Sequence, residues 1–188
     1  MSRNYVCEFD DLCDATAATL DTLARIKEKE PKFQVTLFTI PRRTSPETIA
    51  KAKALGDWIH LAPHGWRHTR GECLGWAKEE ALLKISLARD MGIDSPCFKA
   101  PAWLIDTEIY DACEELGYVV CDHKDFHEPN HSTRVYRYND HLYRAKKTTP
   151  IHGHLTNCMD NWIEDMAKDG RLSFATGSTF LTLVEAAV

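Results

Sequence analysis

The sequence predicts an α/β protein whose strands and helices alternate around a largely parallel sheet or barrel. Short segments rich in β-branched and aromatic residues, such as 34–40, recur between longer segments with helical periodicity. Helix start and stop signals separate these segments, as in Ser45-Pro46 followed by Gly56. Residues with catalytic or metal-binding chemistry stand at the ends of several predicted strands, where parallel α/β folds carry their active sites.

The first half of the chain supplies three strands and two helices. A strand over 5–9 stops at Asp10-Asp11, and Asp14 is the expected N-cap of a helix over 15–29. The next elements are a strand at 34–40, a helix that starts at Ser45-Pro46 and ends before Gly56, and a strand over 58–62 that leads to His64.

The second half continues the same alternation. A helix over 76–91 carries Leu83, Leu87 and Met91 at four-residue spacing and is expected to end at Gly92. The remaining predicted elements are a strand at 97–101, a helix from the N-cap Asp106 to Gly117 with Ile109, Ala112, Cys113 and Leu116 on one face, strands at 118–121, 134–138 and 142–143, a strand over 148–152 running into His154, a helix at 162–168 and a strand at 172–175.

Length and composition predict a single domain over 1–188. The 188 residues are enough for one sizeable core, with 44% hydrophobic and 27% charged residues. The net charge of -5 argues against nucleic acid as a partner, and no apolar run approaches the length of a membrane span. The start of the chain carries no apolar leader, so we expect a cytoplasmic protein.

The cysteines predict free thiols. There are seven of them and none forms a Cys-x-x-Cys pair, which argues against both a disulfide framework and a thiolate zinc site. Four lie in apolar strand or helix patterns and are expected to be buried: Cys7, Cys97, Cys113 and Cys121.

A metal site is indicated by His64 and His68, which are separated by four positions. That spacing lets both imidazoles converge on one ion, and Asp11 would add a carboxylate ligand. Two histidines and one carboxylate leave positions open for water and substrate, as hydrolytic or oxidative chemistry requires. Taken separately, an Asp-Asp pair is usually a turn or helix cap and a His-x-x-x-His often binds nothing, so the argument rests on their combination.

The order and separation of five motifs resemble the polysaccharide deacetylase family (NodB-homology domain). The resemblance covers most of the chain and is carried by Phe9-Asp10-Asp11, His64-Gly65-Trp66-Arg67-His68, Phe98-Lys99-Ala100-Pro101-Ala102-Trp103, Leu116-Gly117-Tyr118 and Ile151-His152-Gly153-His154. It implies an incomplete or distorted (β/α) barrel. It also implies a metal-dependent hydrolase that removes N-acetyl groups from sugars.

The resemblance assigns roles to individual residues. Asp11, His64 and His68 would hold the divalent metal, usually zinc in this family. Asp10 would be the general base, and Lys99 stands where the family has the arginine that positions this base. The usual glycine after the two aspartates is Leu12 here.

The family's last histidine, which protonates the leaving amine, is expected at His154 rather than His152. Pro101 and Trp103 in the third motif are candidates for substrate contact, although Trp103 can equally be a core aromatic. Asp122, at a strand end, is a candidate for substrate contact or for orienting a catalytic group.

Other aromatic and histidine residues favour structural interpretations. Trp66 is expected to pack in the core, and His60 to lie on a different part of the sheet from the metal ligands. The spaced histidines His123, His127 and His131 are expected in a solvated loop, because Pro129 interrupts any helix there.

Three functions stay open at this point. The first is a deacetylase acting on an N-acetylated or O-acetylated carbohydrate. The second is a hydrolase of another small amide or cyclic amide on the same metal centre. The third, motivated by Lys99 and Leu12, is a carbohydrate-binding relative that has lost efficient chemistry.

Overall fold

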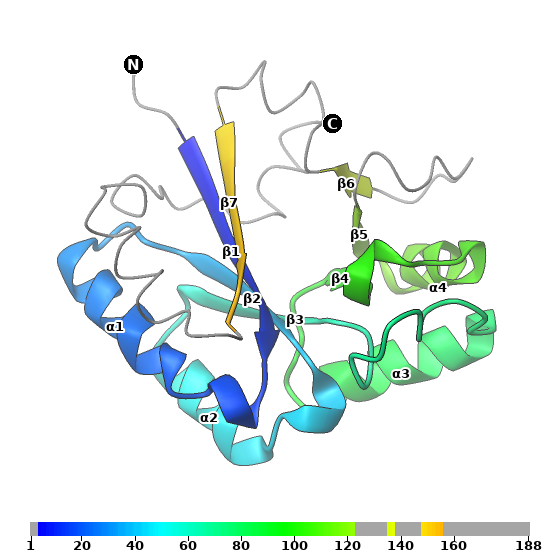
Figure 1. Cartoon of the computed structure of the whole chain (residues 1–188), viewed down its shortest axis with the longest axis horizontal. Helices are drawn as coiled ribbons and strands as arrows, with labels where there is room; N and C mark the ends of the chain where they lie inside the picture. Colours follow the sequence, from blue (N-terminus) through cyan, green and yellow to red (C-terminus); the bar gives the residue numbers. More distant parts are fainter. Residues whose placement is uncertain (1–3, 123–134, 138–147, 156–188) are drawn as a thin grey trace.

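The protein is an open α/β barrel in the computed structural model, which describes residues 4–122, 135–137 and 148–155 (Figure 1). In these residues the strands are β1 Asn4–Leu12, β2 Val35–Thr39, β3 Ile59–Pro63, β4 Cys97–Lys99, β5 Val119–Asp122, β6 Val135–Arg137 and β7 Thr148–His154. The α-helices are α1 Thr19–Lys29, α2 Pro46–Ala54, α3 Lys78–Asp90 and α4 Thr107–Leu116. Short 3-10 turns lie at Asp14–Thr16, Pro41–Arg43 and Pro101–Trp103.

The strands form two parallel sheets that meet at the site described below. One has the order β3-β2-β1-β7 and the other the order β4-β5-β6. A single parallel bridge between His64 and Lys99 joins the end of β3 to β4. Among the described residues no pairing joins β6 to β7, so the barrel is not closed. This arrangement confirms the predicted incomplete or distorted (β/α) barrel.

Two hydrophobic clusters hold the sheets and helices together. The first fills the space between β1, β2, β3 and the helices α1 and α2, with Phe9, Leu23 and Leu37 fully buried. The second lies between β4, β5, α3 and α4, with Phe98 and Ile109 fully buried. Trp66 is partly buried and packs against both clusters, in line with its expected structural role.

The helix starts follow the sequence only in part. The Ser45 side chain accepts a hydrogen bond from the amide of Thr48 and Pro46 occupies the first turn of α2, as predicted. Asp14 does not cap a helix over 15–29, because α1 starts at Thr19. Its carboxylate instead accepts hydrogen bonds from the Ser45 amide and hydroxyl, at 2.8 Å each, and from the Thr48 hydroxyl at 2.7 Å. Asp14 therefore connects the start of the chain to α2.

The apolar residues at four-residue spacing do not form the buried face of α3, which runs over Lys78–Asp90 within the predicted 76–91. Leu83, Leu87 and Met91 are 59%, 41% and 37% exposed. The buried residues are Ala81, Ile85 and Ala88; Ala81 and Ile85 pack in the cluster that includes α4, and Ala88 packs in the first cluster. Four-residue spacing marks one stripe of a helix, but it does not tell which stripe meets the core.

The α4 prediction holds for its buried face and its end. Ile109, Ala112 and Cys113 are buried, and Gly117 ends the helix in the left-handed conformation with φ 72°. Asp106 occupies the N-cap position but makes no capping bond, because its carboxylate accepts a hydrogen bond from the Gly75 amide at 2.5 Å.

The remaining predictions divide between described and undescribed residues. Cys7, Cys97, Cys113 and Cys121 are buried free thiols, as expected. Every helix in the described residues is too short or too polar to span a bilayer. The following predictions fall outside the described residues: the strands at 142–143 and 172–175, the helix at 162–168, and the loop histidines His123, His127 and His131. The single domain over 1–188 stays a prediction.

Candidate metal centre and active site

A bulge in β1 brings two consecutive carboxylates to one place. In a regular strand Asp10 and Asp11 would point to opposite faces. The pairing of β1 with β2 shifts register between Phe9 and Leu12, and Asp11 has a left-handed backbone with φ 72°. The predicted strand 5–9 therefore continues through both aspartates to Leu12 instead of stopping before them. Such backbone strain is found where a side chain must be aimed for function.

Asp11, His64 and His68 converge from β1, the end of β3 and the following loop. Their ligand atoms all lie within 4.8 Å of one another. Oδ1 of Asp11 is 2.9 Å from Nε2 of His68 and 3.7 Å from Nε2 of His64. One carboxylate oxygen and two imidazole nitrogens form a donor set that suits a catalytic divalent metal with open positions. These residues therefore fit the predicted metal. The identity of the metal ion stays a prediction.

His64 is oriented by the neighbouring sheet. Its Nδ1 donates a hydrogen bond to the main-chain oxygen of Lys99 at 3.0 Å, which leaves the lone pair on Nε2, toward the aspartates. The side chain is buried, and burial lowers its pKa. His64 is therefore kept in the neutral form that binds a metal.

The loop that carries His68 is held by Glu72, a residue that sequence reasoning missed. Its carboxylate accepts hydrogen bonds from the amides of Trp66, Arg67 and His68 at 3.0, 2.9 and 2.8 Å. His68 itself has φ 60°, and its hydrogen bond with Asp11 raises its pKa. Three successive amides around one carboxylate fix the direction in which the His68 ring leaves the loop.

Asp10 belongs to a buried charged network with Lys99 and Glu8. Nζ of Lys99 lies 2.7 Å from Oδ1 of Asp10 and 2.7 Å from Oε2 of Glu8, and all three residues are at most 3% exposed. Burial raises the pKa of Asp10 more than any single neighbour changes it, but the charges of Lys99, His64 and His152 and the hydrogen bond from Lys99 together outweigh burial, so the pKa is lowered. Asp10 is therefore ionised at neutral pH.

Glu8 is the second residue that sequence reasoning missed. It lies two positions before Asp10, on the same face of β1. A charged residue inside the otherwise apolar segment Val6-Cys7-Glu8-Phe9 was the available signal, because a fully buried glutamate needs an ionic partner.

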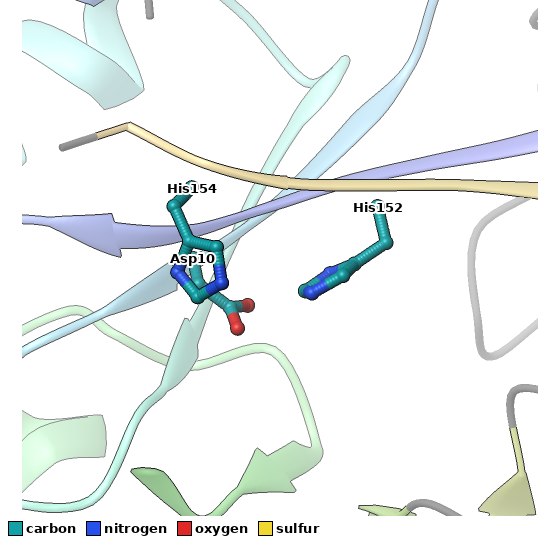
Figure 2. Close-up of side chains that lie close together, drawn as sticks. All are labelled: Asp10, His152 and His154. Atoms are coloured by element: carbon teal, nitrogen blue, oxygen red, sulfur yellow. The ribbon is translucent and has the colours of Figure 1, made fainter. Parts of the chain in front are cut away.

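His152 and His154 come from β7, which runs beside β1. The register pairs Glu8 with His152 and Asp10 with His154. Nδ1 of His154 lies 2.9 Å from Oδ2 of Asp11, and this hydrogen bond raises the pKa of His154. Nδ1 of His152 lies 2.8 Å from Oε1 of Glu8. Figure 2 shows both rings turned toward the carboxylate of Asp10.

The other predicted site residues differ in their relation to this centre. Trp103 is half-buried, and its ring centroid lies 5.8 Å from that of His152, at the edge of the site. Pro101 is buried at the start of the same 3-10 turn. Asp122 is only 1% exposed and accepts a hydrogen bond from the Tyr110 hydroxyl at 2.5 Å. This burial argues against the predicted substrate contact of Asp122.

Fold and site together define an open parallel α/β barrel with a metal-capable Asp-His-His cluster at the carboxyl ends of its strands. No known family profile and no curated protein sequence matches the chain. Solved structures do match, among them family 4 carbohydrate esterases (CE4) and a peptidoglycan deacetylase.

Three of these structures illustrate the likeness. A CE4 pseudoenzyme from Bacillus anthracis has a TM-score of 0.67 at 12% identity, over 97% of this chain and 66% of that one. A peptidoglycan deacetylase from Bacillus subtilis has 0.61 at 17% identity, over 99% and 92%. A family 4 acetyl xylan esterase from Clostridium thermocellum, in complex with a cobalt ion, has 0.63 at 13% identity, over 98% and 91%. The chain therefore has the NodB-type deacetylase fold, which confirms the predicted resemblance.

Proposed function

We propose that this protein is a metal-dependent hydrolase that removes acetyl groups, foremost N-acetyl groups, from a carbohydrate. The observation that carries the proposal is the convergence of Asp11, His64 and His68 directly beside an ionised, lysine-anchored Asp10. The likeness to an acetyl xylan esterase and a peptidoglycan deacetylase supports the reaction class. The substrate class and the metal, which we expect to be zinc, are part of the proposal.

The chemistry assigns one task to each group. Asp11, His64 and His68 would hold the divalent ion, which would polarise the acetyl carbonyl and lower the pKa of a water to roughly 7. Asp10 accepts a proton from the attacking water, because its lowered pKa keeps it ionised. Its Oδ1 is held by Lys99, so Oδ2 is the oxygen that takes the proton.

His154 donates a proton to the leaving amine as the carbon–nitrogen bond breaks. Its Nδ1 is held by Asp11, which leaves Nε2 as the donor, and its raised pKa keeps the ring charged closer to neutral pH. With 52% of its side chain exposed, His154 is also accessible to a substrate. These features favour His154 over His152 as the acid.

Lys99 positions the base Asp10, the task of the family's arginine, with a different geometry. A lysine ammonium lacks the flat bidentate fork of a guanidinium, but it has three donors. One is directed to Asp10 and another to Glu8, so the two carboxylates together fix the ammonium in place. Trp103, near His152 at the edge of the site, offers an apolar face to a sugar ring.

Acetate release is the experiment that tests this function. The purified protein, loaded with zinc, cobalt or nickel, is incubated with N-acetylglucosamine oligomers, peptidoglycan, acetylated xylan and simple linear and cyclic amides. We expect acetate from at least one acetylated carbohydrate. We also expect a loss of roughly 100- to 10,000-fold in Asp10→Asn, with the ion at Asp11, His64 and His68 retained.

Two results would redirect the proposal. Turnover of simple amides in preference to every acetylated sugar would favour the small-amide hydrolase. Normal metal binding with no turnover at all would favour a carbohydrate-binding relative. One of the structures with this fold is a pseudoenzyme. Lys99→Arg separates a weakened enzyme, which would gain activity, from a protein without catalysis.

A further inference from the structure

A second metal-capable cluster lies next to the first and is formed by Asp10, His152 and His154. Their ligand atoms also lie within 4.8 Å of one another. Figure 2 shows the two rings, from β7, approaching the Asp10 carboxylate, from β1. The two clusters share no residue, but Asp10 and Asp11 are adjacent in the chain.

Each member of this cluster has a charged neighbour at its other polar atom: Asp10 and His154 through a hydrogen bond, and His152 through an ion-pair contact that lacks hydrogen-bond geometry. Lys99 holds Oδ1 of Asp10 at 2.7 Å, and Oδ2 of Asp10 lies 3.7 Å from Nε2 of His64 in the first cluster. Nδ1 of His152 lies 2.8 Å from a carboxylate oxygen of Glu8, and Nδ1 of His154 lies 2.9 Å from one of Asp11. When Nδ1 carries the proton of such a pair, the lone pair is on Nε2. Histidines paired with carboxylates in this way are typical metal ligands.

The register of two strands builds this cluster. Glu8 and Asp10 alternate along one face of β1, and they pair with His152 and His154 on β7. The two imidazoles are 30% and 52% exposed, whereas Asp10 is buried beneath them. An ion from solvent therefore reaches the cluster without opening the barrel.

The local charge makes this cluster the weaker of the two. Glu8, Asp10 and Asp11 carry three negative charges, and Lys99 makes ion pairs with Glu8 and with the cluster ligand Asp10. The first cluster uses Asp11, which is 2.9 Å from two imidazoles rather than from an ammonium. A divalent ion bound there also repels a second one, so we expect ordered filling.

We propose that Asp10, His152 and His154 form a second, weaker divalent-cation site, and that an ion bound there stops hydrolysis. The inhibition rests on the proposed function, because an ion on Asp10 and His154 occupies both the base and the acid. The cation binding itself is independent of any activity.

Titration of the metal-free protein with zinc tests the binding, with the number of ions and their affinities measured by calorimetry and equilibrium dialysis. We expect two ions per wild-type chain, the second bound at least 10-fold more weakly. His152→Asn should bind one ion with an unchanged first affinity, which also shows that the variant is folded. Glu8→Gln should weaken the second ion by roughly 10- to 100-fold, as loss of an anchoring carboxylate does. His60→Asn, a change of a histidine outside both clusters, should keep both ions.

Activity measured against zinc concentration tests the inhibition. The activity of wild type should rise to a maximum at about one ion per chain and fall as the second site fills. His152→Asn, scaled to its own maximum, should show no such fall. Saturation of wild type at one ion, or two ions in His152→Asn, would overturn the second site and leave the proposed function intact. Wild type that binds two ions and stays active with both would overturn the inhibition, whereas no bound ion at all would remove the proposed function too.

Discussion

Replacing Lys99 with methionine should destabilise the protein severely. Lys99 is fully buried and lies 2.7 Å from carboxylates of both Glu8 and Asp10, so Lys99→Met leaves two buried negative charges without their shared cation. Removing one partner of a buried ion pair costs about 3–5 kcal/mol. Lys53→Met is the matched control, because Lys53 makes an ion pair with Asp94 in which both side chains are about half exposed. That change should cost under about 1 kcal/mol.

The loss of unfolding free energy in Lys99→Met should also depend on pH. In wild type the pKa of Asp10 is lowered, so its ionised form stabilises the fold above roughly pH 4 and this stabilisation is lost as the pH falls through the folded-state pKa. Without Lys99 the pKa of Asp10 should rise, and the folded variant then gains stability as the pH falls. Urea denaturation at pH 8 and pH 5 should therefore show a smaller difference from wild type at pH 5. A cost equal to that of Lys53→Met, or one independent of pH, would refute this account of the network.

Three further predictions concern the site and its loop. His154→Asn should lower kcat by roughly 100- to 10,000-fold. Because the pKa of His154 is raised, wild-type activity should persist above about pH 6.5 and fall as the pH rises through that pKa. The same fall of activity at alkaline pH in the variant would contradict the assignment of His154 as the acid. Glu72→Ala should weaken zinc binding by about 10-fold in calorimetry because it releases three loop amides, whereas exposed Glu80→Ala should not; equal affinities would remove this role. Gly65→Ala should lower the free energy of unfolding by about 1–3 kcal/mol and by more than Gly75→Ala. Both glycines have positive φ, but only at Gly65 would a Cβ collide with neighbours, namely the Glu72 carboxylate and the Pro101 ring, the latter at 2.8 Å; equal costs in urea denaturation would contradict the steric argument.

Much of the fold was predictable because the local signals agree with the packing. The alternation of strands and helices, the cap at Ser45 and the stop at Gly117 all appear as expected. The face of α3 was not predictable, since exposed Leu83 and Leu87 carry the same spacing as a buried stripe. Which face a helix buries depends on the element it meets, and that information is not local.

The site divides along the same line. Asp11, His64 and His68 were identifiable because residue type, spacing and strand ends point to one chemistry. Glu8 was missed, because its cation lies 91 positions away in the sequence. Glu72 was missed because its partners are main-chain amides, which carry no signature in the sequence.

Metal content is the measurement that tests the central claim most directly. Wild type, Asp11→Ala and His64→Ala are loaded with zinc, freed of excess ion and compared by elemental analysis, with His60→Asn as the control. The arrangement of the Asp11, His64 and His68 ligand atoms predicts one tightly held ion in wild type and in the control, and its loss in both ligand variants. No bound ion in wild type after loading with zinc, cobalt or nickel, or full retention in the ligand variants, would contradict the metal centre and the hydrolase built on it.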